Sequence, residues 1–193
     1  MSAIRETNLY MNIFYLNSNP RLCAKYHVDK HCVKMIVEYS QLLSTAHRVL
    51  DGYQSIEVVN NRKLKRWVLD NQLLDSVLYK ATHVNHPSAV WVRQSSENYM
   101  WLAQLLWDLS DEYTYRYGKV HKCMDSGLIQ YLFEHIPKSI PRKQFTEPTP
   151  AMPDKYKVPA SSMLSYHNYY NGDKRKLFSW KFRNVPEFIT GLE

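Results

Sequence analysis

The strongest helical pattern in the chain is residues 19–52, NPRLCAKYHVDKHCVKMIVEYSQLLSTAHRVLDG. Asn19 offers an N-cap with Pro20 in the first helical turn, and the next glycine is Gly52. Between them, apolar residues recur at helical spacing and show no period-two alternation: Leu22, Tyr26, Val33, Ile36, Val37, Leu43 and Leu50. We therefore predict one long helix over about residues 20–50.

A second long helix is predicted over residues 96–117. Ser95 precedes it as a capping residue, and Gly118 follows it as a stop. Between the two long helices, residues 53–63 are polar and irregular, and residues 64–79 return to a helical pattern.

The remaining segments are shorter. The apolar run of residues 11–16 predicts a short extended segment laid against the core. Helices are predicted over residues 125–136 and 161–171, separated by a proline-rich connector, and residues 174–182 are expected to continue the last helix.

Length and composition predict a single compact domain over residues 1–193. An apolar content of 45% excludes disordered and collagen-like chains, and one core serves a chain of this size. The predicted fold class is therefore all-α. Residues 1–12 lack the apolar core of a signal peptide, and no apolar run approaches the roughly 20 residues of a membrane span. We expect a cytoplasmic protein that does not cross a membrane.

The charge balance favours an anionic partner. Lys and Arg number 25 against 18 Asp and Glu, a net charge of +7, which is typical of proteins that bind nucleic acid. Phosphate-binding glycine loops, GxSxG and paired-cysteine metal motifs are absent from the sequence, so those enzyme classes are disfavoured. Three cysteines without a CxxC pair fit a reducing compartment.

The first candidate site is a titratable stripe on the long helix. His27, His31, Lys34 and Glu38 fall within roughly a 60° arc, and Lys30 flanks it. A lysine beside a histidine and a carboxylate can act as an amine nucleophile. Two histidines one turn apart with Glu38 can instead ligate a metal, and Lys30 with Lys34 can instead neutralise phosphates. The alternative without a function is that these residues simply form a solvent-exposed face of the helix.

Two further clusters carry residues suited to DNA. His83, His86 and Arg93 surround a His-Pro step before a helix, where free N–H groups attract an anion, although His86 can merely cap that helix. The other cluster interleaves aromatic and basic side chains, as proteins that grip phosphates and unstacked bases do: Tyr166, Tyr170, Lys174, Arg175 and Lys176.

This layout resembles the small pyrimidine-dimer DNA glycosylase/AP lyase family. The resemblance rests on the run MNIFYL at residues 11–16, the long helix from His27 to Glu38, the Asn85-His86-Pro87 step and the run EYTYRYG that ends at Gly118. The segment DKHCVKM, residues 29–35, is also similar to the DKHxVKM-type segment of a group of uncharacterised bacteriophage proteins.

The resemblance implies a metal-free, cofactor-free, all-helical enzyme that acts on double-stranded DNA. In that family the N-terminal amine attacks a sugar carbon of the damaged nucleotide, and a glutamate on the first long helix assists. Here residues 1–10 extend beyond the family's usual start, which displaces the terminal amine. With His27 aligned to the family's first-helix histidine, the catalytic glutamate falls near Lys34, and Glu38 lies one turn later.

The sequence thus predicts a DNA-binding protein, phage-encoded and in the host cytoplasm, that acts on damaged or modified pyrimidines with a flipped base. Lys30 or Lys34 replaces the terminal amine, with Glu38 or Asp29 as acid–base partner. One rival is a metal-dependent helical hydrolase that uses His27, His31 and Glu38; another is a non-catalytic nucleic-acid-binding or interaction protein.

Overall fold

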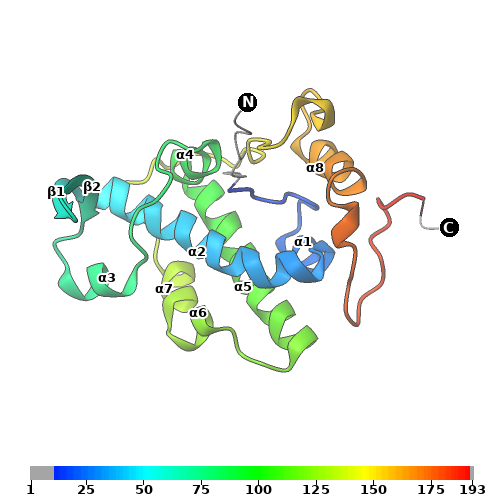
Figure 1. Ribbon diagram of the computed structural model, residues 1–193, viewed down its shortest axis with the longest axis horizontal. Coiled ribbons are helices and arrows are strands. Elements are labelled where there is room, and N and C mark those ends of the chain that lie inside the picture. The colour runs from blue at the N-terminus through cyan, green and yellow to red at the C-terminus, as the bar shows by residue number, and fades with distance from the viewer. Residues whose placement is uncertain (1–10, 192–193) are drawn as a thin grey trace.

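Two long helices cross at the centre of the molecule (Figure 1). The computed structural model describes residues 11–191, and the chain is 51% helical. Helix α2 (Asp29–Asp51) packs across α5 (Ser96–Tyr117), and α4 (Pro87–Gln94) contacts both. The prediction of an all-α fold is wrong, because a small two-stranded antiparallel sheet extends from the helical body.

Helix α5 has the predicted boundaries. The Ser95 hydroxyl accepts a hydrogen bond from the backbone N–H of Glu97, which satisfies a free donor of the first turn. Gly118 ends the helix in the left-handed region, with φ of 63°, and its N–H donates to the carbonyl of Thr114. Both ends are therefore decided by neighbouring residues.

The predicted helix over residues 20–50 is wrong, because the chain leaves the helical conformation at His27 and Val28. Their ψ angles are 131° and 156°, and both residues are fully buried. The result is a short helix, α1 (Pro20–Tyr26), followed by α2. His27 ends one helix and no longer shares a helical face with the residues after the break.

Distant side chains satisfy the backbone at this break. Arg116 donates to the carbonyl oxygens of Lys25 and His27, and the Trp180 indole N–H donates to that of Tyr26. These carbonyls would otherwise be buried without partners, which is costly. The break is therefore stabilised by residues that lie 89 or more positions away along the chain.

Residues 53–68 form a β-hairpin rather than the predicted loop and helix start. Strand β1 (Tyr53–Val59) pairs with β2 (Arg62–Val68) through Val59↔Arg62 to Tyr53↔Val68. Asn60 and Asn61 have φ of 48° and 60°, the positive values of a two-residue type I′ turn, which asparagine tolerates. Only α3 (Gln72–Val77) remains of the helix predicted over residues 64–79.

Gly127 divides the helix predicted over residues 125–136. Its φ is 76°, outside the helical region, and the chain forms α6 (Lys122–Asp125) and α7 (Leu128–Glu134) around it. The proline-rich connector is confirmed as extended chain, with one 3-10 turn, η1 (Asp154–Tyr156).

Helix α8 (Ser162–Asn171) confirms the last predicted helix, but residues 174–182 do not continue it. At Gly172 the chain passes so close to the Tyr156 ring that an added Cβ would lie 2.4 Å from it. After that contact the chain forms only the 3-10 turn η2 (Arg175–Leu177).

The core lies between α2, α4, α5 and the extended segment of residues 11–16. Ile13 and Leu16 in that segment are fully buried, as predicted for a chain laid against the core. Trp91 and Tyr99 are also core residues and offer no stacking surface. Among residues 11–191, no helix is long and apolar enough to cross a membrane.

Candidate functional site

A small pocket lies where the first half of α2 meets the extended N-terminal segment and the end of α8. Its volume is about 90 Å³. We call it the α2 pocket and define it by its lining residues: Asn12, Phe14, His31, Lys34, Met35, Glu38, Tyr169 and Lys174. The pocket thus combines three residues of the predicted helix stripe with one of the predicted basic–aromatic cluster, which are more than 130 residues apart in the sequence.

His31 forms the buried wall of the pocket. Its ring stacks on Phe14, with centroids 4.1 Å apart, and Nδ1 lies 2.7 Å from the Tyr170 hydroxyl. Burial holds the pKa of His31 well below its usual value, and the cations Lys174 and Lys34 lower it further. The imidazole is therefore neutral at pH 7.

Lys34 and Glu38 form an i,i+4 ion pair at the mouth of the pocket. Lys34 Nζ lies 2.9 Å from Glu38 Oε1. The Lys34 side chain is 68% exposed and that of Glu38 only 15%. The two residues of the predicted stripe therefore line one pocket, with the carboxylate more buried than the ammonium.

Lys174 is the second lysine of the α2 pocket, and it is half-buried. Its Nζ lies 4.7 Å from the centroid of the Tyr169 ring. Burial lowers the pKa of Lys174, the positive charge of Lys34 lowers it further, and Asp173 and Glu38 partly oppose both effects. A larger share of this amine is consequently neutral at a given pH than for an ordinary lysine.

Sequence reasoning missed Asn12, Phe14, Met35 and Tyr169 as pocket residues. Asn12 is 3% exposed, and its Oδ1 accepts a hydrogen bond from the Tyr166 hydroxyl at 3.4 Å. A polar side chain inside the otherwise apolar run of residues 11–16 is a signal that could have found it.

Two aromatic residues predicted to bind DNA are core residues instead. Tyr166 and Tyr170 are fully buried, and their hydroxyls contact Asn12 and His31 respectively. Neither ring can stack on a base. Their role in the structure is to support the polar wall of the pocket.

Three other residues predicted to be catalytic lie outside the pocket. His27 is fully buried, where its Nδ1 donates to the Cys23 carbonyl and its Nε2 accepts from the Tyr39 hydroxyl. Asp29 binds Arg116, Ser179 and the backbone of Lys181, so its carboxylate stabilises the fold. Lys30 is exposed and does not line the pocket.

The predicted His-Pro cluster does not line the pocket either. His86 caps α4 by accepting from the N–H of Ser88, and Arg93 donates to the carbonyls of Val84 and Ala89. His83 is exposed and contacts the Thr82 hydroxyl. These bonds give His86 and Arg93 local structural roles at the two ends of α4.

Arg175 and Lys176, next to Lys174, also lie outside the pocket lining. The Arg175 guanidinium donates to the carbonyls of Thr190 and Gly191, and Lys176 is exposed. Of the basic run, only Lys174 enters the site.

The residues proposed for a metal do not meet. His27 uses both ring nitrogens within the core, and Glu38 pairs with Lys34. Within the described part of the chain, no group of three or more His, Cys, Asp or Glu side chains is arranged to hold a metal ion. The three ligands of the hydrolase hypothesis, His27, His31 and Glu38, therefore do not surround one metal position.

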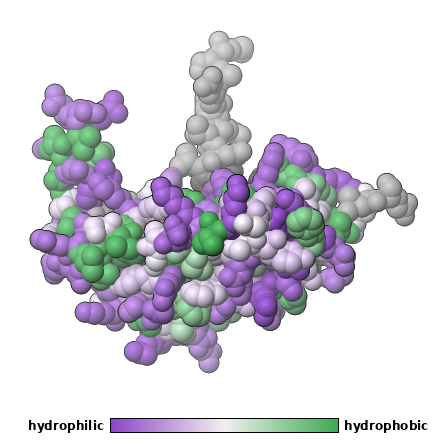
Figure 2. Space-filling model, turned by 90° about the horizontal axis from the view of Figure 1, so that it is seen from below, coloured by the Kyte–Doolittle hydropathy of each residue, from purple (hydrophilic) through white to green (hydrophobic). Residues whose placement is uncertain are grey.

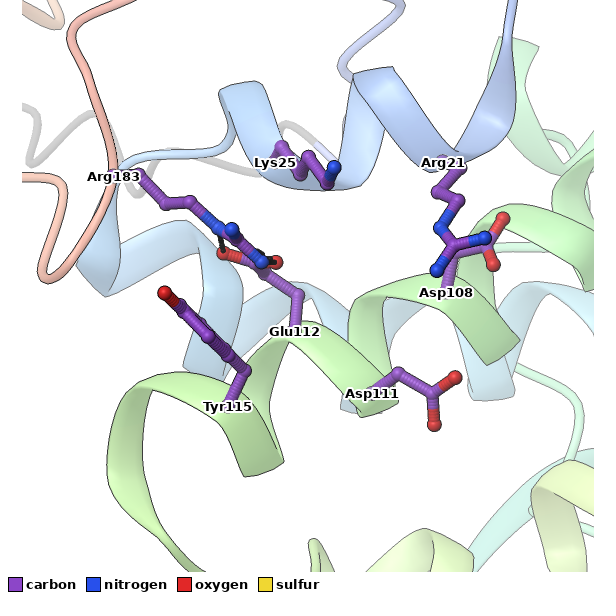
Figure 3. Close-up of a pocket in the computed structure, with 7 residues that line it drawn as sticks. All are labelled: Arg21, Lys25, Asp108, Asp111, Glu112, Tyr115 and Arg183. Carbon is purple, nitrogen blue, oxygen red and sulfur yellow. Dashed lines mark hydrogen bonds and ion pairs between the residues drawn. The ribbon is translucent and has the colours of Figure 1, made fainter.

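A larger pocket, about 340 Å³, lies between α1 and α5 (Figure 3). Arg183 spans it to reach Glu112 and lies over the Tyr115 ring, 3.8 Å from the centroid. Three cations face three carboxylates, so the pocket has no charge preference: Arg21, Lys25, Arg183, Asp108, Asp111 and Glu112. The α2 pocket, with two lysines and one carboxylate, is the better candidate for an anionic substrate.

No family model, curated protein or solved structure matches this chain. The residues of the α2 pocket therefore carry the functional interpretation.

Proposed function

We propose that the protein is a DNA glycosylase/AP-lyase-like enzyme, in which Lys174 forms an imine with the sugar of an abasic or damaged nucleotide. The observation that supports this most strongly is the half-buried amine of Lys174, with a lowered pKa, in a pocket that also holds Glu38. A neutral amine is the form that attacks a carbon centre. Lys30 and Lys34 are more exposed and less suited to this role.

The chemistry requires an amine and an acid–base group. Lys174 Nζ attacks C1′ of the ring-opened abasic sugar, the carbinolamine loses water, and an imine forms. Glu38 then removes a proton from C2′, and the electron pair expels the 3′-phosphate by β-elimination. Water hydrolyses the imine and releases Lys174. On a nucleotide that still has its base, the same attack forms the N–C1′ bond as the base leaves with a proton.

The size of the pocket narrows the substrate. A volume of about 90 Å³ is well below the roughly 300–1,000 Å³ of sites that enclose a whole small molecule. A sugar carbon can enter while the rest of the nucleotide stays outside. This favours reaction at the sugar over tight enclosure of a flipped pyrimidine.

Borohydride trapping on duplex DNA with one abasic site tests the proposal. Borohydride reduces the imine and leaves a covalent adduct, and we expect mass spectrometry of the digested adduct to place it on Lys174. Lys174→Ala should abolish the adduct, and Glu38→Gln should slow its conversion to cleaved strand. Lys30→Ala, an exposed lysine outside the pocket, is the matched control and should trap normally.

Two outcomes would overturn the proposal. An adduct of normal yield in Lys174→Ala would move the nucleophile elsewhere, and mapping would show whether it is the amine of Met1, which lies outside the described residues. If the wild type bound duplex DNA but gave no adduct, the protein would be a non-catalytic DNA-binding protein and not an enzyme of this kind.

A further inference from the structure

The β1–β2 hairpin stands out from the helical body as a finger (Figure 2, upper left). Residues 53–68 carry four cations and one carboxylate: Arg62, Lys63, Lys65, Arg66 and Glu57. Glu57 is paired with Arg66, at 2.6 Å between Oε2 and Nε. The finger therefore has a net positive charge that its own residues do not neutralise.

Strand register separates the finger into two faces. Side chains alternate across a strand, so the pairs Val58↔Lys63 and Ile56↔Lys65 lie on one face. Ile56 and Val58 are 66% and 63% exposed, and both lysines are exposed. The opposite face carries Glu57 and Arg66 and covers a pocket beside Arg48. The face with two lysines and two aliphatic side chains is therefore the outward one.

From this face we infer that the hairpin is a docking element for double-stranded DNA, an inference that rests on the proposed function. Lys63 and Lys65 neutralise phosphates of the backbone, and the tip residues Asn60, Asn61 and Arg62 enter a groove. A two-stranded ribbon fits the major groove, which is about 12 Å wide, and Asn and Arg are suited to base edges there. Exposed Ile56 and Val58 suit the methyl groups of thymine.

The finger lies at a distance along α2 from the pocket that one duplex can span. The hairpin follows the C-terminus of α2, and Glu38 lies 13 residues before Asp51 on the same helix. At 1.5 Å per residue the separation is about 20 Å, or roughly six base pairs of duplex. The hairpin would then hold the DNA on one side of the reacting nucleotide.

Duplex affinity as a function of salt tests this inference, with the double variant Lys63→Ala/Lys65→Ala. We expect affinity to fall roughly tenfold at low salt, and the slope of log affinity against log salt to become shallower by about 1.8, as for two lost phosphate contacts. The matched control is Lys119→Ala/Lys122→Ala, which removes the same charge from exposed positions on the α5–α6 side and should bind like the wild type.

The trapping reaction separates this inference from the proposed function. At saturating protein, Lys63→Ala/Lys65→Ala should still give the adduct on Lys174. Equal affinities of the hairpin and control variants, or no duplex binding by the wild type, would overturn the hairpin inference. Trapping on a single-stranded abasic oligonucleotide would still decide the chemistry.

Vesicles that contain phosphatidylserine provide a second comparison. If Lys63 and Lys65 were needed for binding these vesicles and not for binding duplex, a lipid surface would replace DNA as the partner, and the inference would be wrong.

Discussion

Two charged clusters lie along the first half of α2, and they differ in how completely the protein satisfies them. The first, the Arg116 cluster, comprises Arg116, Asp29, Glu112 and Arg183. Arg116 is fully buried and donates to Glu112, to Asp29 and to two backbone carbonyls. Arg183 donates to both oxygens of Glu112. Each charge of this cluster therefore has partners within the protein.

The α2 pocket is the incomplete cluster. Glu38 pairs with Lys34 at 2.9 Å, but Lys174 lies over an aromatic ring and beside a second ammonium. The two clusters therefore shift pKa values for different reasons. Burial would raise the pKa values of Asp29 and Glu112, yet hydrogen bonds hold both below their usual range. Burial and Lys34 instead lower the pKa of Lys174, which destabilises its charged form.

A charged cluster indicates a candidate site when the protein does not supply partners for all of its charges. In the sequence, the Arg116 cluster was represented only by Asp29 and by the run EYTYRYG that contains Glu112 and Arg116. Its residues stabilise a helix break. The α2 pocket keeps an amine of altered basicity next to a carboxylate. Substitutions should therefore affect stability in the first cluster and reactivity in the second.

The largest effect is expected from Arg116→Ala. The substitution leaves the carbonyls of Lys25 and His27 without their donor and Glu112 with Arg183 alone, and should lower the free energy of unfolding by about 3–5 kcal/mol. Urea denaturation measures this. Lys34→Ala is the matched cation of the other cluster and should cost about 0.5–1 kcal/mol, because the Lys34 side chain is 68% exposed and makes one ion pair. If the two variants lost similar free energy of unfolding, the Arg116 cluster and the α2 pocket would not differ in their contribution to stability.

The next effect is acid destabilisation through buried neutral histidines. Burial lowers the pKa of His27 and of His47 to about 4. Between about pH 6.5 and pH 4 the unfolded chain binds protons that the folded chain does not, so stability falls as the pH falls. From pH 7 to pH 5.5 the two residues together should cost roughly 2–3 kcal/mol.

Urea midpoints across this pH range test the acid effect. His27→Gln removes one of the titrating groups, so its stability should depend less steeply on pH. An unchanged slope in His27→Gln would mean that this ring is not held neutral.

The sequence predicted those parts of the fold that local residues decide. Ser95 and Gly118 determine the ends of α5 within a few residues, so the helix was predicted correctly. The break at His27 depends on Arg116 and Trp180, and helical periodicity contains no information about them. Asn60-Asn61 after two valines is a hairpin signal that the apolar spacing of residues 64–79 concealed.

The candidate site was predictable to the same limited extent. Lys34 and Glu38 lie one turn apart, so their meeting followed from helix geometry. Lys174 reaches the pocket only because the chain turns after α8, at the close contact of Gly172 with Tyr156. The sequence therefore assigned Lys174 to a basic–aromatic cluster that binds DNA, and it gave the role of nucleophile to Lys30 or Lys34.

The smallest effect, and the sharpest test of the pocket, is the response of the pKa of Lys174 to two of its charged neighbours, Lys34 and Glu38. Removal of the positive charge in Lys34→Ala should raise this pKa, because the ammonium of Lys174 loses a repulsive partner. Glu38→Gln should lower it, because an attractive partner is lost. Lys30→Ala, outside the pocket, should leave it unchanged. Both pocket variants should stay folded, since each removes a single ion pair and Lys34 is largely exposed.

Reductive ¹³C-methylation of the lysines, followed by NMR titration, measures this pKa without any reaction of DNA, and the lost signal of Lys174→Ala assigns the resonance. Shifts of opposite sign for Lys34→Ala and Glu38→Gln would show that Lys174 senses both charges, as an amine inside the pocket must. Shifts of the same sign, or none, would place Lys174 in solvent. The nucleophile would then lie elsewhere, because a fully solvated lysine is almost entirely protonated at pH 7 and has no advantage over the other exposed lysines of the chain.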